Sequence, residues 1–291
     1  MPRVHVGPED RVIRLRDGRF MGFAEYGDPD GFVVVNAHGG LAGRLDVAPA
    51  DQVARKSGVR LLSPDRPGIG LSDTQPGRTV LDWARDVEDL LDQLDIGRFA
   101  VMGWSMGGQY AAAVGFALVP RVTRVAIIAG ALPLTEPGVF GQLTLMDRVF
   151  TRLCQRAPVV ARPSFRAMAA VALHAPTLFC RVSALTLGAA DAAVLRSEPA
   201  ENYALMTGEA LRTAAGVVED YRAWMRPWGF APEDLRVPVD VWDGTEDELV
   251  PRAWPPELAR RIDGATLFIR PGGHFLAHLH YREIFDALRR A

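Results

Sequence analysis

The chain has 291 residues, of which 48% are hydrophobic and 23% charged, and its formal net charge is −2. This length suits one large α/β domain with an insertion, and the composition is that of an ordinary globular protein rather than a fibrous or disordered one. The small net charge, with arginines scattered and no basic block, provides no field that would attract nucleic acid or an acidic membrane surface.

Cysteines, apolar runs and nucleotide motifs narrow the class further. Cys154 and Cys180 are too few for a disulfide framework, and we expect reduced thiols in a cytoplasmic protein. The N-terminal segment has no apolar run of the signal-peptide type, and the longest apolar stretch, residues 122–134, is too short to cross a bilayer. No P-loop or dinucleotide fingerprint occurs, so we expect no cofactor and no metal. The expected partner is a small-molecule substrate, bound by a monomer or a homodimer.

Strand and helix patterns alternate along the first part of the chain. Alternating residues on both sides of Asp17-Gly18 predict a β-hairpin. Apolar β-branched runs then alternate with helical periods three times up to residue 130, which predicts a parallel sheet with helices on both faces. The expected strands lie in 32–40, 59–73, 98–105 and 122–130, and the expected helices in 47–58, 79–95 and 105–120.

This alternation stops near residue 131 and returns near residue 237. Residues 132–232 have helical periods punctuated by prolines and no clear strand, and an unstructured loop of that length is improbable. Strands in 237–244 and 265–273 and helices in 254–264 and 275–290 follow. We therefore predict an α/β fold with a mostly parallel, doubly wound sheet of about eight strands. Residues 1–131 and 233–291 would form the core, and residues 132–232 a helical cap.

The stretch GWSMG, residues 103–107, places a serine between two glycines where a strand should end and a helix begin. It has the Gly-x-Ser-x-Gly form of a nucleophile elbow in the proper strand–turn–helix setting. Such a sharp turn exposes the hydroxyl, and glycines two positions away avoid collision with neighbouring elements. The start of the helix offers free N–H groups to an oxyanion. Ser105 is therefore the candidate nucleophile.

A serine nucleophile needs a base and an acid that orients the base, here in the chain order Ser, acid, His. Among the six histidines, only His274 directly follows a late strand, in the glycine-rich loop of FIRPGGHF. A metal pair of His274 and His278 is disfavoured because no third ligand is evident. For the acid, Asp247 lies on the loop at the carboxyl edge of the sheet and is preferred to Glu246.

The motifs HGG, SPDRPGIGLSD, GWSMGG, GTEDELVP and GGHF together resemble those of the α/β-hydrolases, over nearly the whole chain. They look most like the capped branch that includes epoxide-hydrolase-like and carboxylesterase-like proteins. The resemblance implies Ser105 as nucleophile, Asp247 as acid and His274 as base. Relatives that open epoxides or remove halides have Asp as nucleophile, so the serine here argues against both reactions.

The same resemblance implies an oxyanion hole made by the backbone N–H groups of Gly40 and Met106, with Leu41 as second choice to Gly40. His38 is expected to hold this loop. The segment HGGLAG lacks the proline that often follows His-Gly-x in relatives, and Glu248 stands where relatives often have proline. Asp65 and Arg66 are expected to be a turn-stabilising pair on a charged surface turn, without a catalytic role.

These residues predict a serine esterase that cleaves an ester or related acyl bond of a small, largely apolar substrate. For Trp104 we expect a packing role beside the histidine loop or under the cap, in preference to pocket lining. Alternatives are carbon–carbon bond hydrolysis, lactone hydrolysis or acyl transfer on the same triad, and a non-catalytic receptor on the same fold. The candidate pocket residues are Leu41, Trp104, Met146, Phe150, Trp224 and Phe275.

Overall fold

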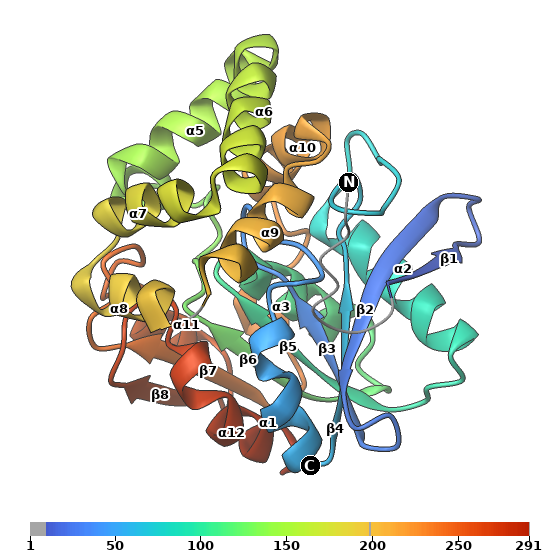
Figure 1. Ribbon diagram of the computed structural model, residues 1–291. Coiled ribbons are helices and arrows are strands. Elements are labelled where there is room, and N and C mark those ends of the chain that lie inside the picture. Colours follow the sequence, from blue (N-terminus) through green and yellow to red (C-terminus); the bar gives the residue numbers. More distant parts are fainter. Residues whose placement is uncertain (1–9, 198, 291) are drawn as a thin grey trace.

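The computed structural model describes residues 10–197 and 199–290, so His5 and the start of the N-terminal segment lie outside the described part. In this part an eight-stranded sheet has the order β1-β2-β4-β3-β5-β6-β7-β8 (Figure 1). The pairs β1–β2 and β2–β4 are antiparallel and all others are parallel, as predicted. The strands are β1 Arg11–Arg14, β2 Phe20–Gly27, β3 Phe32–Ala37, β4 Val59–Pro64, β5 Phe99–Trp104, β6 Val122–Ile128, β7 Val239–Gly244 and β8 Thr266–Arg270.

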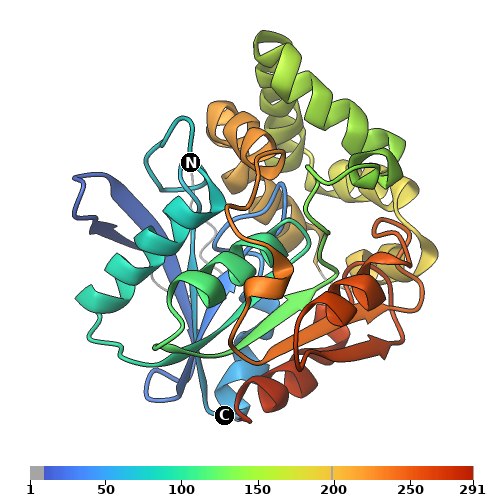
Figure 2. The same ribbon diagram turned by 180° about the vertical axis from the view of Figure 1, so that it is seen from behind.

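Helices cover both faces of this sheet, which confirms the doubly wound arrangement. Figure 1 has α1 and α12 in front of the sheet, and Figure 2 has α2, α3 and α11 in front of the opposite face. Helix α3 is buried along most of its length, because it lies between the sheet and α2. The helices are α1 Asp51–Lys56, α2 Val80–Gln93, α3 Gly107–Ala117, α11 Trp254–Arg261 and α12 Ala277–Leu288; short 3₁₀ turns occupy Ala48–Ala50 and Pro232–Asp234.

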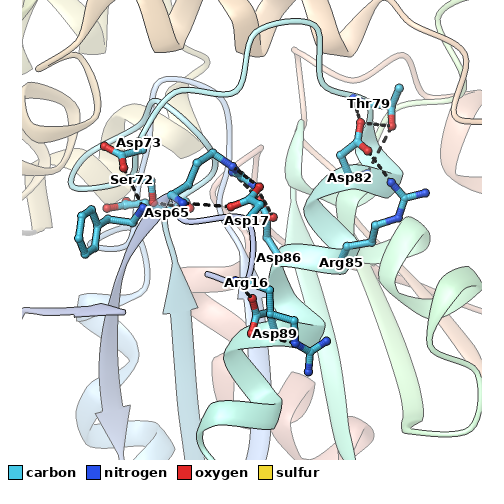
Figure 3. Close-up of polar contacts among 12 residues, drawn as sticks. Arg16, Asp17, Asp65, Ser72, Asp73, Thr79, Asp82, Arg85, Asp86 and Asp89 are labelled. Carbon is cyan, nitrogen blue, oxygen red and sulfur yellow. Dashed lines mark hydrogen bonds and ion pairs between the residues drawn. The ribbon is translucent and has the colours of Figure 1, made fainter. Parts of the chain in front are cut away.

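Polar contacts fix α2 against the N-terminal hairpin (Figure 3). Thr79 caps the helix in a capping box with Asp82, in which each side chain accepts from the backbone of the other. The guanidinium of Arg19, in the hairpin turn, binds Asp86 on α2. The Arg19–Asp86 contact therefore joins the hairpin turn to α2, while the pairing of β2 with β4 joins the hairpin to the sheet.

Residues between β6 and β7 form seven helices in the described part of the chain, and we call these the inserted helices. Both ribbon views show them as a layer at one end of the sheet (Figures 1 and 2). Pro158 and Pro176 stand at the starts of two of them, where the missing N–H costs nothing. The inserted helices are α4 Val139–Gln142, α5 Leu145–Arg156, α6 Pro158–His174, α7 Pro176–Thr186, α8 Ala189–Ser197, α9 Ala200–Ala210 and α10 Ala214–Trp224.

Candidate active site

Ser105 lies in the tight turn between β5 and α3, with a left-handed φ of 56°. This conformation is strained for a residue with a side chain. The backbone N–H of Ser105 donates to the Ile128 carbonyl at 2.8 Å, which pins the turn to β6. A Cβ on Gly107 would lie 2.0 Å from the Ala37 carbonyl oxygen, and one on Gly103 would lie 2.3 Å from the Gly107 carbonyl oxygen. Only glycine therefore fits on either side of the serine.

Backbone N–H groups lie near this turn without acceptors. In the part of the chain that the structure describes, the N–H groups of Gly40, Leu41 and Met106 donate to no protein oxygen. The Gly40 loop contacts Met106 directly, because a Cβ on Gly40 would lie 3.3 Å from the Met106 methyl carbon. Leu41 has a left-handed φ of 56°, so this loop is also strained. Gly40, Leu41 and Met106 all line the cavity that Ser105 lines.

The His274 ring contacts Asp247, and Glu246 does not take this place. Nδ1 of His274 lies 2.9 Å from Oδ2 of Asp247, and both side chains are buried. The other carboxylate oxygen of Asp247 accepts from the N–H groups of Leu249 and Val250, at 2.8 and 2.9 Å. Burial opposes its charged form, but His274 and these two N–H groups outweigh burial and lower the pKa of Asp247. The carboxylate is therefore ionised and held in one orientation.

Three carboxylates act on the pKa of His274. Burial lowers that pKa, but Asp247, Asp191 and Asp147 together outweigh burial and raise it above 6.5. Asp247 comes from the loop after β7, and the other two come from the inserted helices α8 and α5. Carboxylates from the loop after β7 and from the inserted helices thus both stabilise the imidazolium form of His274.

Asp243 is a further buried acid beside this pair, to which the sequence motifs assigned no role. It lies at the end of β7, and its Oδ1 has no hydrogen-bond partner within the described chain. Burial and the neighbouring charge of Asp247 raise the pKa of Asp243 to about 7. The only feature of the sequence that could have placed Asp243 near the site is its position at the end of β7, four residues before Asp247.

Asp191, on α8, was also missed. Its side chain is fully buried, and its Oδ1 accepts from the Phe275 N–H at 2.7 Å. The carboxylate packs on the backbone of the histidine loop, because a Cβ on Gly273 would lie 2.4 Å from that oxygen. No sequence pattern relates residue 191 to residue 275, so only the fold could reveal this contact.

The expectation of a surface turn at Asp65 and Arg66 is wrong, because both side chains are completely buried. Asp65 stabilises its turn by accepting from the Leu71 N–H at 3.0 Å, and it pairs with Arg44. Arg66 pairs instead with Asp220 on α10, with donor–acceptor distances of 2.9 and 2.7 Å. Burial is possible because each charge has an opposite charge and further hydrogen bonds.

Arg66 and His38 together fix the loop that leads to Gly40. The guanidinium of Arg66 donates to the carbonyl groups of His38 and Gly39, the latter at 2.8 Å. Nε2 of His38 accepts from the Arg66 N–H at 3.0 Å, and its Nδ1 lies 3.0 Å from the Gly39 carbonyl oxygen. Burial and Arg66 lower the pKa of His38 well below 6.5, so the ring is neutral. His38 therefore holds its loop.

A cavity of about 680 Å³ separates the Ser105 turn from the inserted helices. Ser105, His274, Gly40 and Met106 line it, and its walls are largely apolar. The inserted helices supply most of the wall. The structure also places around this cavity all six candidate pocket residues: Leu41, Trp104, Met146, Phe150, Trp224 and Phe275.

Trp104 both packs against the histidine loop and lines this cavity. Its Nε1 donates to the His274 carbonyl at 2.8 Å, and its ring lies 5.4 Å from the His274 ring and 5.1 Å from the Phe275 ring. A Cβ on Gly39 would lie 2.4 Å from the indole. The packing and lining roles, set against each other in the sequence analysis, are therefore combined in one side chain.

A second cavity of about 270 Å³ adjoins the first. The two share Trp104, Tyr203, Met206 and Phe275 as a common wall. His278 lines the second cavity but not the first, and burial lowers its pKa to about 4.

Within residues 10–197 and 199–290, no group of three or more His, Cys, Asp and Glu side chains is arranged to hold a metal ion. None of the helices in those residues has the length and apolar character needed to cross a bilayer.

Comparison with known proteins agrees with this fold. The family model described as alpha/beta hydrolase family matches residues 32–287. Similar solved structures include an esterase from Exiguobacterium antarcticum (18% identity, TM-score 0.73, covering 97% of this chain and 98% of that one). An enol-lactonase from Burkholderia xenovorans is 19% identical (TM-score 0.71, covering 96% and 98%), and a thermophilic esterase from Thermogutta terrifontis, solved with malate bound, is 21% identical (TM-score 0.67, covering 97% of each). The protein belongs to the alpha/beta hydrolase family.

Proposed function

We propose that this protein is a serine hydrolase that cleaves the ester bond of a small, largely apolar substrate. The observation that carries the proposal is that Ser105, in its strained turn, lines one cavity together with His274, whose ring is paired with Asp247. A nucleophile, a base and an oriented acid are the groups that acyl transfer needs. The esterases among the structural neighbours are consistent with this reaction.

In the proposed mechanism Nε2 of His274 accepts the Ser105 proton while the serine oxygen attacks the ester carbonyl carbon. The N–H groups of Met106 and of Gly40 or Leu41 stabilise the oxyanion that forms. The ester C–O bond then breaks, and the alcohol leaves with the proton from His274. Water, deprotonated by the same ring, attacks the acyl-enzyme, and the acid departs as Ser105 regains its proton. Asp247 keeps the ring in the tautomer that these transfers require.

The inserted helices are proposed to act as the cap that selects the substrate, with residues 132–232 as the cap and the remainder as the catalytic core. They supply most of the wall of the cavity above Ser105, so their side chains determine its shape. The walls are apolar, so burial of apolar substrate surface would provide most of the binding free energy.

The decisive test compares Ser105→Ala with Ser183→Ala, a second serine that lines the same cavity. We expect Ser105→Ala to reduce hydrolysis of short-chain aryl esters by a factor of about 10⁴ or more and to abolish labelling by a fluorophosphonate. Ser183→Ala should keep both within about threefold. The same assays include a lactone, a β-diketone and an added alcohol acceptor, which test the alternatives of lactone hydrolysis, carbon–carbon bond hydrolysis and acyl transfer. Full ester turnover by Ser105→Ala would refute the nucleophile, and labelling without any turnover would favour the receptor alternative.

A further inference from the structure

Apart from the ring of His274, the ionisable side chains that line the active-site cavity are acidic. Asp147 and Glu248 line it, and within the described residues no lysine or arginine does. Asp247 and Asp191 lie directly behind His274 and add two more carboxylates nearby. Low-dielectric walls concentrate such a field inside a cavity, where solvent screens it poorly.

Among the described residues, Asp147, in the first turn of α5, is one of the two acids that line this cavity. Its Oδ2 accepts from the Thr144 hydroxyl at 2.8 Å, and no arginine or lysine pairs with it in the part of the chain described. Burial raises its pKa, and the influence of Thr144 and His274 does not fully offset that effect. A partly buried carboxylate without a cation is stabilised by any cation that enters.

Three aromatic residues of the inserted helices α5 and α10 line the same cavity as Asp147. Phe150 lies one turn further along α5, and its ring centroid is 6.4 Å from that of Tyr221, which contacts Trp224 at 6.1 Å. All three line the cavity. Burial and the nearby carboxylate of Asp147 raise the pKa of Tyr221. A carboxylate together with aromatic rings in one cavity provides the surroundings that bind alkylammonium groups.

We propose that Asp147 with Phe150, Tyr221 and Trp224 forms a subsite for a positively charged amine, so that the substrates are esters that carry an alkylammonium group. The inference takes its reaction from the proposed function, but the subsite itself is a binding property. The same field acts on the product, because hydrolysis converts the neutral ester group into a carboxylate. A cavity with these acids repels that anion and favours its release.

The test uses three para-nitrophenyl esters with the same linear acyl chain, ending in a trimethylammonium group, a tert-butyl group or a carboxylate. The first two have nearly the same shape, so their ratio isolates the effect of charge. We expect kcat/KM to fall in the order cation, neutral, anion, with the cation favoured over the neutral ester by about tenfold. Equal values for these two, or preference for the neutral ester, would overturn the proposal.

Asp147→Asn removes the charge and keeps an oxygen that can accept from Thr144. This variant should lower the ratio of cation to neutral ester by about three- to tenfold. The ratio cancels any change in His274 basicity, because both esters use the same base. The matched control is Glu201→Gln, an exposed acid at the start of α9 that does not line the cavity, and it should leave the ratio unchanged.

Binding to Ser105→Ala separates this inference from the proposed function. Calorimetry with the same cationic and neutral chains, as unreactive methyl ketones, measures the preference without turnover. If the wild-type protein hydrolyses none of the esters, the proposed function fails, and tighter binding of the cation would still support the subsite. If esters are hydrolysed and the neutral ketone binds as tightly as the cation, the subsite alone fails.

Discussion

The sheet core and the inserted helices follow different packing rules. Around the Ser105 turn, glycines meet backbone atoms so closely that a single added carbon would overlap them. The inserted helices instead leave large apolar side chains in solvent, among them Leu185 at 85% exposure and Val159 at 78%. The close packing of the core fixes the backbone of the Ser105 turn, whereas the inserted helices enclose the cavity next to it. The first needs a unique geometry, whereas the second tolerates many.

The difference is not complete where the two parts meet, because a Cβ on Gly216 of α10 would overlap the Gly68 carbonyl oxygen. Two buried carboxylates also join the two parts. Asp220 on α10 reaches Arg66, which holds the loop before Gly40. Asp191 on α8 holds the backbone of the histidine loop. At these two points the inserted helices share the tight, fully buried packing of the core, so they support the loops of the site as well as covering it.

The largest expected effect comes from adding one carbon in each region. Gly107→Ala places a Cβ 2.0 Å from the Ala37 carbonyl oxygen, whereas a Cβ on Gly141, in α4, meets nothing within 4 Å. We expect Gly107→Ala to cost more than about 5 kcal/mol and to leave little folded protein. Gly141→Ala should change the free energy of unfolding by less than about 1 kcal/mol, in the stabilising direction. Urea denaturation followed by circular dichroism measures the free energy of unfolding of both variants. Similar decreases in the two would contradict the difference in packing between the core and the inserted helices.

A smaller effect is expected at the Asp220 contact. Asp220→Asn leaves Arg66 and Arg78 buried beside a neutral group, which should lower the free energy of unfolding by about 3 kcal/mol. Glu219→Gln, the adjacent acid in a partly exposed pair with Arg222, should cost less than about 1 kcal/mol. Denaturant unfolding at neutral pH distinguishes them, and equal losses would show that the contact contributes no more than a surface pair.

The same contact predicts how the loss depends on pH. Burial opposes ionisation, but Arg66 and Arg78 hold the pKa of Asp220 at about 2, below its ordinary value of 3.8. A depressed carboxylate pKa stabilises the folded state fully above 3.8, and this stabilisation is lost as the pH falls toward 2. The difference between wild type and Asp220→Asn should therefore shrink in acid. A constant difference from pH 7 to pH 3 would contradict the assignment.

The parts of the fold that the sequence predicts are those specified locally. Continuous apolar runs predict the strands, because a parallel strand that is buried on both faces needs apolar side chains on both. The glycines around Ser105 predict the turn because steric exclusion acts on immediate neighbours. The pairing of His274 with Asp247 follows from both loops lying at the carboxyl edge of one sheet.

The missed contacts depend on how distant segments pack. Arg66 and Asp220 are 154 positions apart, and nothing in either neighbourhood specifies the other. The turn at Arg66 has the composition of a surface turn, and α10 buries it only after the chain has formed the inserted helices. In the sequence, Asp191 and Asp147 are ordinary acids in the first turns of two helices. Only the packing of these helices brings them near His274.

The smallest expected effect tests whether α8 contributes charge to the site as well as packing. Asp191→Asn keeps an oxygen that accepts from the Phe275 N–H but removes the negative charge near His274. The carboxylates that raise the pKa of this ring are Asp247 from the loop after β7, Asp191 from α8 and Asp147 from α5, and Asp243 lies beside Asp247 at the end of β7. Removing one of them should lower the pKa of His274, so the base remains unprotonated at lower pH. The acid limb of kcat/KM should shift downward by about half a pH unit.

A purely structural role for Asp191 would give a different result. Loss of packing would lower kcat/KM or the free energy of unfolding at all pH values and leave the acid limb where it is. Glu201→Gln, which removes an exposed charge from the neighbouring helix, controls for the general effect of net charge and should not move the limb. An unmoved limb in Asp191→Asn would reduce this contact to a hydrogen bond. A shift in Asp191→Asn alone would mean that the basicity of His274 depends on the inserted helices as well as on the loop that carries Asp247.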